Sequence, residues 1–185
     1  MVWRMELRAD ARLAFPRPVV FAAYRDKITD MLPYLPNVRR IEVKERKEAG
    51  DLVTLHNVWH GGGEIPAAAR AFLSEAMLSW DDTAEWKQSD FTCHWVITTH
   101  AFTEAVKCEG WNRFYPDPKA ADGEGTLLEI RGTLEIDARK VKGVPGFLAG
   151  KVGKAVEEFL TGKIQPNLVE VTHGLRQYLE ANAKK

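Results

Sequence analysis

The sequence has no excess of either charge and few cysteines. Its 185 residues include 26 Lys and Arg against 26 Asp and Glu. A chain without net charge has no general attraction to nucleic acid or to an anionic membrane, so we expect no nucleic-acid partner. Two cysteines, Cys93 and Cys108, are too few for a disulfide framework. We expect both to be reduced core thiols of a cytoplasmic protein.

Long apolar runs are also missing. No stretch approaches the roughly 18 uninterrupted apolar residues of a membrane-spanning helix, so no integral membrane segment is expected. The opening residues 1–6 are not a basic start followed by an apolar core, and we therefore expect no signal peptide. Transient contact with a membrane surface stays open, as does the oligomeric state.

The common catalytic and metal-binding motifs are absent as well. The sequence contains no G-x-S-x-G, P-loop or G-x-G-x-x-G motif, and no HxH, HExxH or CxxC spacing. His56 and His60 share a predicted strand face, but four residues of extended chain separate them by about 13 Å. We therefore expect no metal and no cofactor, and we interpret the three glycines at 61–63 as a hinge.

What the sequence does contain is alternation of apolar and polar residues. Between Trp3 and Phe15, apolar residues occupy every second position and charged residues the positions between them. This period of two predicts a strand with one buried and one exposed face, which is typical of an antiparallel sheet. Seven strands are predicted in all, over residues 3–15, 38–43, 52–59, 80–87, 91–99, 106–115 and 128–137.

The remaining segments predict helices. Pro18 suits the first turn of a short helix, and residues 26–35 indicate a second one. An alanine-rich run at 66–77 predicts an inserted helix on the glycine hinge. Apolar residues at three- and four-residue steps predict a final helix of about 35 residues that begins near 147, with Pro166 expected to kink it or weaken its hydrogen bonding.

This order of elements favours one architecture. A wide sheet with one apolar face and a long helix with one apolar side each need the other as cover. We therefore predict an α+β fold in which a seven-stranded curved antiparallel sheet surrounds the long C-terminal helix. No repeat, low-complexity tract or linker divides the chain, so residues 1–185 are expected to form a single domain. The shapes of a sheet and one helix do not match perfectly, which leaves space between them.

Three stretches carry a resemblance to a known superfamily. They are Ala14–Phe21 at a strand-to-helix junction, Leu32–Val38 leading into the second strand, and Gly125–Ile136 followed by the final helix. In these the chain resembles the START-like, Bet v 1-like (SRPBCC) superfamily of helix-grip domains, which includes polyketide cyclases and lipid-transfer proteins. The resemblance implies a cavity for a hydrophobic small molecule such as a lipid, sterol or polyketide. The helix at 66–77 departs from the usual short hairpin.

Polar side chains on the inward face are the candidates for chemistry. Strand phase places Asn57, Asp82 and Asn112 among apolar inward residues, where they either bond one another or water, or bind a ligand. In an apolar cavity the pKa of Asp82 would rise, which suits acid–base work. Several tryptophans are also predicted to face inward. The predicted ligand-binding residues are Asn57, Trp59, Phe72, Met77, Trp80, Asp82, Trp95, Asn112, Phe147 and Val156.

Three functions fit these observations. The leading one is binding or transport of a hydrophobic small molecule in an internal cavity gated by segments 61–77 and 143–148, with no residue assigned as catalytic. The second is a polyketide cyclase or aromatase, in which Asp82, Asn57 or His94 would move protons. The third is a regulatory module that uses an exposed apolar patch and has no cavity.

Overall fold

The computed structural model describes most of the chain. The described residues are 2–62, 65, 74, 78–121, 123–141 and 149–183, without the side chains of 138, 149, 152, 153 and 156. All seven predicted strands lie within these ranges, as does most of the predicted final helix. The inserted helix predicted at 66–77 falls outside them.

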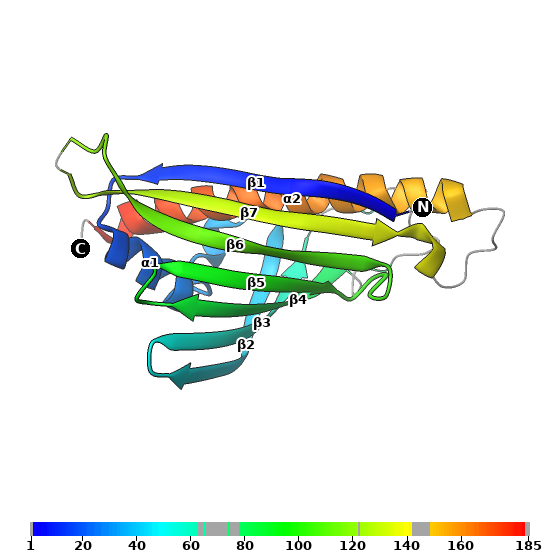
Figure 1. The fold of residues 1–185 in the computed structure, drawn as a ribbon, viewed down its shortest axis with the longest axis horizontal. Coiled ribbons are helices and arrows are strands. Elements are labelled where there is room, and N and C mark those ends of the chain that lie inside the picture. The colour runs from blue at the N-terminus through cyan, green and yellow to red at the C-terminus, as the bar shows by residue number, and fades with distance from the viewer. Residues whose placement is uncertain are drawn as a thin grey trace.

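Seven strands form one antiparallel sheet in the order β1-β7-β6-β5-β4-β3-β2 (Figure 1). Side chains alternate between a buried and an exposed face, most regularly in β6, as the period of two predicted. β1 and β2 are the two edges of the sheet. The strands are β1 (Val2–Leu13), β2 (Val38–Ala49), β3 (Leu52–Gly61), β4 (Ser79–Lys87), β5 (Thr92–Thr99), β6 (Val106–Asp117) and β7 (Gly125–Asp137).

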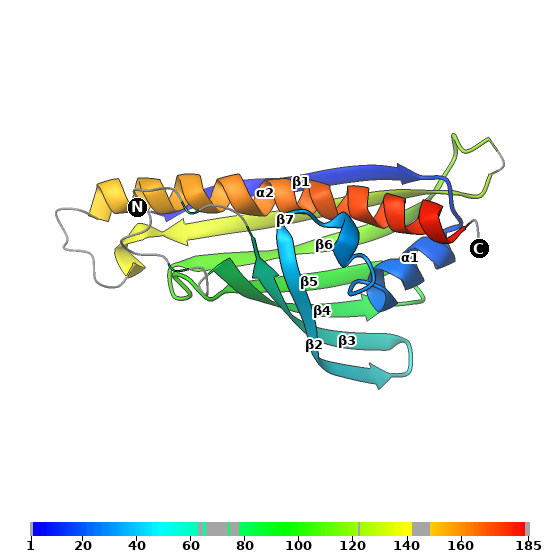
Figure 2. The ribbon, with the colours of Figure 1, turned by 180° about the vertical axis from the view of Figure 1, so that it is seen from behind.

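The long helix α2 (Ala149–Asn182) lies across one face of the sheet and runs beside β1 (Figures 1 and 2). The side-chain amide of Gln165 fixes it there, because Oε1 accepts from Arg8 N at 3.1 Å and Nε2 donates to Arg8 O at 2.6 Å. These two bonds satisfy backbone groups that an edge strand otherwise leaves unpaired. The predicted helix-grip architecture is confirmed, and α2 is held toward one edge of the sheet.

One helix continues through Pro166. Pro166 has no N–H to donate to the carbonyl of Gly162 four residues earlier. Both residues lie on the exposed side of α2, where water can bond the free carbonyl. Pro166, where a kink or weaker hydrogen bonding was expected, therefore lies inside one continuous helix of 34 residues.

Between β1 and β2 the chain forms one helix, α1 (Arg17–Asp26), and one short 3₁₀ turn, η1 (Leu32–Tyr34). The second helix predicted at 26–35 is therefore wrong. Tyr34 N bonds Met31 O and Leu35 N bonds Leu32 O, which is the tighter three-residue pattern. Pro33 has no N–H to donate, and Pro36 disfavours α geometry at Leu35, so these prolines prevent a longer helix.

Candidate functional site: a cavity between the sheet and α2

A cavity of about 140 Å³ lies between the sheet and α2. Its walls come from β3, β4 and β5 on one side and from the apolar face of α2 on the other. The helix supplies Phe159, Leu160, Ile164, Leu168 and Val171. Because α2 is bonded to the β1 edge, the opposite half of the concave face is left less closely covered. The space outlined by these residues lies over β3–β5.

Six predicted site residues line this cavity: Asn57, Trp59, Trp80, Asp82, Trp95 and Asn112. Strand pairing brings them together, because Asn57 lies directly opposite Asp82, and Trp59 directly opposite Trp80. The Trp59 and Trp80 rings stack with centroids 5.7 Å apart and an interplanar angle of 16°. One part of the wall is thus a flat aromatic surface beside a polar pair. Contact of these residues with a ligand stays a prediction.

Trp95 lies in a slot that two glycines make in the neighbouring strands. Gly110 pairs with Trp95 across β5 and β6, and Gly132 pairs with Gly110 across β6 and β7. A Cβ on Gly110 would overlap the Trp95 ring, and one on Gly132 would lie 2.6 Å from it. The indole N–H donates to Asn112 Oδ1 at 2.8 Å, and both residues are buried. Trp95 and Asn112 therefore satisfy each other and form a rigid part of the wall.

Other polar atoms of the wall have no such partner. Asn57 is 3 % exposed and its Oδ1 accepts no hydrogen bond; the indole N–H groups of Trp59 and Trp86 are buried and donate none within the described residues. A buried polar group without a partner costs about 1–3 kcal/mol. Native proteins leave few of them, and those that persist require an explanation. Three of these atoms belong to residues of the cavity wall.

Asp82 shares this environment. Burial raises the pKa of its carboxyl to about 7. The Trp59 indole N–H and the charge of His56 act in the opposite direction, but only partly offset the effect of burial. The Trp59 N–H approaches the carboxyl without reaching good hydrogen-bond geometry. Asp82 is half-buried because it faces the cavity. The carboxyl can therefore exchange a proton near neutral pH, as the sequence predicted.

Tyr24 is a wall residue that the sequence did not reveal. It comes from α1, and its ring packs edge-on against Trp86 with centroids 5.3 Å apart. Burial, followed by the charges of Asp82 and Cys93, raises its pKa well above the ordinary range, so the phenol stays neutral. Burial also raises the pKa of the Cys93 thiol, which makes this wall residue a poor nucleophile. No local pattern marks Tyr24, because the position of α1 against the sheet is a tertiary feature.

The remaining predicted site residues cannot be placed. Phe72, Met77 and Phe147 lie outside the described residues, and so does the side chain of Val156. The expected gates at 61–77 and 143–148 fall largely in the same undescribed ranges. Gly61, Gly62 and Leu78, which adjoin the insertion, line the cavity. The insertion therefore begins and ends at the cavity wall.

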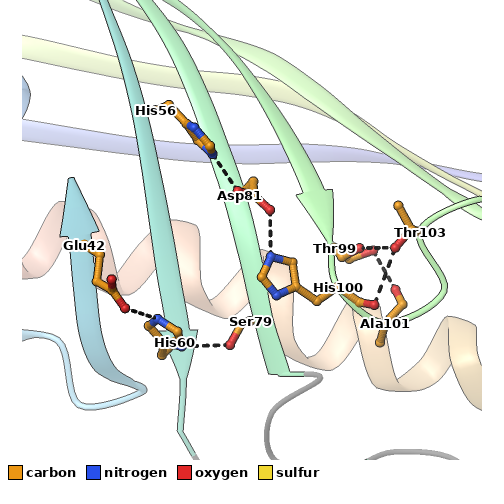
Figure 3. Close-up of polar contacts among 9 residues, drawn as sticks. All are labelled: Glu42, His56, His60, Ser79, Asp81, Thr99, His100, Ala101 and Thr103. Atoms are coloured by element: carbon orange, nitrogen blue, oxygen red, sulfur yellow. Dashed lines mark hydrogen bonds and ion pairs between the residues drawn. The ribbon is translucent and has the colours of Figure 1, made fainter. Parts of the chain in front are cut away.

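A second polar cluster lies on the outer face of the sheet, and its members are paired (Figure 3). Asp81 accepts from His56 Nε2 at 2.5 Å through one oxygen and from His100 Nε2 at 2.6 Å through the other. Burial acts to raise the pKa of Asp81, but these two hydrogen bonds together lower it below its ordinary value. The cluster ties β3, β4 and the end of β5 together near the insertion.

His60 forms a matching link in the same region (Figure 3). Its Nε2 lies 2.8 Å from Glu42 Oε1, and its Nδ1 lies 3.0 Å from Ser79 Oγ. With Nε2–H donated to the carboxylate, Nδ1 accepts from the hydroxyl. Because His60 and Ser79 stand on either side of the insertion, this bond joins its two ends.

His94 does not reach the cavity. It lies on the outer face, 4.6 Å from the Trp111 ring, and the suggestion that it moves protons in a cavity is wrong. The reason is strand parity: Cys93 and Trp95 face inward, so His94 between them faces outward. In the described ranges no three His, Cys, Asp or Glu side chains could hold a metal ion together. None of the described helices is long and apolar enough to cross a membrane.

Comparisons with known proteins agree on the fold. No protein-family model and no curated protein matches the sequence. Among solved structures, TTHA0849 from Thermus thermophilus matches with a TM-score of 0.64 and 20% identity, covering 96% of this chain and 98% of that one. The Zhui aromatase/cyclase from a Streptomyces species matches with a TM-score of 0.66 and 15% identity, covering 98% and 96%.

A third match extends the comparison beyond these two proteins. Ara h 8.0201 covers 97% of this chain and 100% of its own, with a TM-score of 0.52 and 15% identity. At such identities the likeness concerns the backbone and carries no assignment of function. Sheet order, the long C-terminal helix and these matches together show that the chain has the helix-grip fold of the Bet v 1-like, SRPBCC superfamily.

Proposed function

We propose that this protein binds a hydrophobic small molecule in the cavity between the sheet and α2. The observation that carries the proposal is the cavity itself, whose surface is mainly apolar and includes Leu55, Trp59, Trp80, Phe159 and Leu168. Burial of apolar ligand surface against such walls is the main source of affinity in small-molecule sites. The superfamily's fold supports the proposal, because solved members of this fold include an aromatase/cyclase.

The volume narrows the range of ligands. An engineered cavity of about 150 Å³ in another protein accommodates benzene. A cavity of about 140 Å³ therefore suits a compact ligand better than a sterol or a long-chain lipid. Of the hydrophobic classes that the resemblance implies, the smallest ones fit best.

Native mass spectrometry and calorimetry test this function. After gentle purification, the protein is expected to carry a small-molecule adduct or to bind toluene saturably. Ala84→Leu, which extends a buried wall residue into the cavity, is expected to weaken toluene at least tenfold. Thr83→Leu, on the outer face of the same strand, is the matched control and should bind normally.

Folding of each variant is checked by circular dichroism and by its thermal midpoint. Ala101→Val, at another buried wall position, is the second filling variant in case Ala84→Leu does not fold. The absence of any adduct, together with no saturable binding of toluene or indole up to their solubility, would overturn the proposal.

A second function, acid–base catalysis of the cyclase or aromatase type, rests on Asp82. A carboxyl with a pKa of about 7 can both give and take a proton at neutral pH, and Asn57 lies directly opposite it. In this case Asp82→Asn should retain ligand binding but abolish conversion of a bound polyketide mimic, followed by the mass of the product. Unchanged conversion by Asp82→Asn would exclude Asp82 as the proton-transfer group.

A further inference from the structure

The polar groups left without partners define what kind of ligand the cavity recognises. Asn57 is 3 % exposed, its Oδ1 accepts no hydrogen bond within the described residues, and it lines the cavity. Trp59 is 6 % exposed, and its indole N–H donates no hydrogen bond within the same part of the chain. An occupant that satisfies both must therefore offer a donor to Asn57 and an acceptor to Trp59.

These groups converge on one place in the wall. Asn57 and Asp82 are direct partners across β3 and β4, which places their Cβ atoms roughly 5 Å apart. The Trp59 N–H approaches the Asp82 carboxyl closely enough to lower its pKa. The three side chains therefore form one polar patch in a mainly apolar wall. Trp95 and Asn112 do not take part, because they already bond each other.

The chemistry of the three side chains selects among ligand groups. A hydroxyl has one donor and two acceptor sites, so it can donate to Asn57 Oδ1 or Asp82 and accept from Trp59. A carboxylate on the ligand would place its negative charge beside Asn57 Oδ1 and the Asp82 carboxyl, which are both acceptors. An ammonium has no acceptor and would leave the Trp59 N–H unpaired. The hydroxyl is the one of these groups that pairs both Asn57 Oδ1 and the Trp59 N–H, and its second acceptor site can take a hydrogen bond from Asp82 when that carboxyl is protonated.

Size and wall shape select the rest of the molecule. The cavity of about 140 Å³ has room for about one ring, and the stacked Trp59 and Trp80 offer it a flat aromatic face. We propose that Asn57, Asp82 and Trp59 form a hydroxyl-recognition subsite, and that the ligand is a neutral single-ring compound bearing a hydroxyl group. This inference rests on the proposed hydrophobic-ligand function and names its ligand class.

Four matched probes test the subsite by calorimetry at pH 7: p-cresol, toluene, p-toluate and benzylamine. p-Cresol is expected to bind at least tenfold more tightly than toluene, and the two charged probes more weakly than p-cresol. Asn57→Leu, which keeps the approximate shape of the side chain, should remove the preference for p-cresol over toluene. Trp59→Phe, which keeps a ring but removes the N–H, should weaken p-cresol about three- to tenfold more than toluene.

Thr83→Val, on the outer face of β4, is the control and should keep the preference. Circular dichroism and the thermal midpoint show whether Asn57→Leu is folded. If that variant does not fold, Trp59→Phe still tests the subsite. Equal affinity for p-cresol and toluene would mean that water alone fills the subsite, and would overturn the proposal while the hydrophobic-ligand function stands. Tightest binding of p-toluate or benzylamine, or a preference that survives in Asn57→Leu, would also overturn it. No binding by any probe would overturn both.

Discussion

Asp81 and Asp82 are neighbours on β4, yet they occupy opposite environments. Asp81 faces outward and accepts hydrogen bonds from His56 and His100, which hold its pKa below the ordinary value against the effect of burial. Asp82 faces the cavity, where burial raises its pKa to about 7. The same side chain is thus stabilised as a carboxylate on one face and destabilised on the other. The difference shows that the outer cluster is satisfied within the protein, whereas some polar groups of the cavity wall, such as Asn57 Oδ1, have no partner in the described residues.

The strongest test of this difference is the pH dependence of stability. A carboxyl whose pKa is raised on folding binds its proton more tightly in the native state, so stability falls as the pH rises from about 4 to about 7. With a pKa of about 7 against an ordinary 3.8, the loss for Asp82 is on the order of 4 kcal/mol. Between pH 5 and pH 8 the wild type should lose about 3 kcal/mol of this, because only about two pH units of the range lie above pH 5. Urea unfolding of wild type and Asp82→Asn at these two pH values measures the loss, and the variant should not show it.

The free energy of unfolding of Asp82→Asn is compared with that of the wild type at each pH. The histidines contribute equally to both proteins, so their contribution cancels in the difference between the two free energies. Its stability relative to wild type should improve as the pH rises from 5 to 8. If the free energy of unfolding changes with pH in the same way in both proteins, folding does not raise the pKa of Asp82. The contrast between Asp81 and Asp82 would then be wrong.

The next largest effect concerns the inner wall. Gly110→Ala would place a Cβ in overlap with both the Trp95 ring and the carbonyl oxygen of Arg131. Overpacking of this kind costs about 3 kcal/mol, and it should also displace Trp95 from Asn112. Chemical denaturation measures the cost, and the fluorescence of the variant reports the change around Trp95.

Gly162→Ala is the control for that substitution. Gly162 lies in α2, and apart from its own stretch of helix no atom lies within 4 Å of an added Cβ. Alanine should therefore stabilise the helix by about 1 kcal/mol. Equal stability of Gly110→Ala and wild type would show that the slot for Trp95 is not closely packed.

The smallest effect is expected on the outer face. Asp81→Asn replaces one of the two carboxylate oxygens, which accept from His56 and from His100 separately. It should cost about 1 kcal/mol at pH 7, because the cluster is partly exposed. Because the pKa of Asp81 is lowered on folding, this stability is present above about pH 4 and lost as the pH falls through the folded-state pKa.

Urea unfolding at pH 7 and pH 3 checks this expectation. The matched control is Glu85→Gln, an exposed carboxylate on the same face of β4, which should change stability by less than about 0.5 kcal/mol. A loss in Asp81→Asn that is equally large at pH 3 would show that the effect does not come from the charged carboxylate.

Much of the candidate site could be predicted because strand parity is local. The alternation around Trp80, Asp82 and Trp86 placed these side chains inward before any partner strand was known, and the cavity wall contains all three. The failed helix at 26–35 has a different cause. Apolar residues such as Ile28 and Met31 are buried there, but Pro33 and Pro36 restrict the backbone to a turn.

The sequence by itself determined which side chains of each strand share a face, because successive residues of an extended chain project to opposite sides. It also determined that a long apolar-sided helix must cover the inward face. Only the tertiary structure decided which inward polar groups are satisfied. Trp95 reaches Asn112 across the register of β5 and β6, whereas Asn57 Oδ1, on the residue opposite Asp82, has no donor within the described chain. Hydrogen bonding depends on ångström-scale position, and that position comes from strand register and from where α1 and α2 pack.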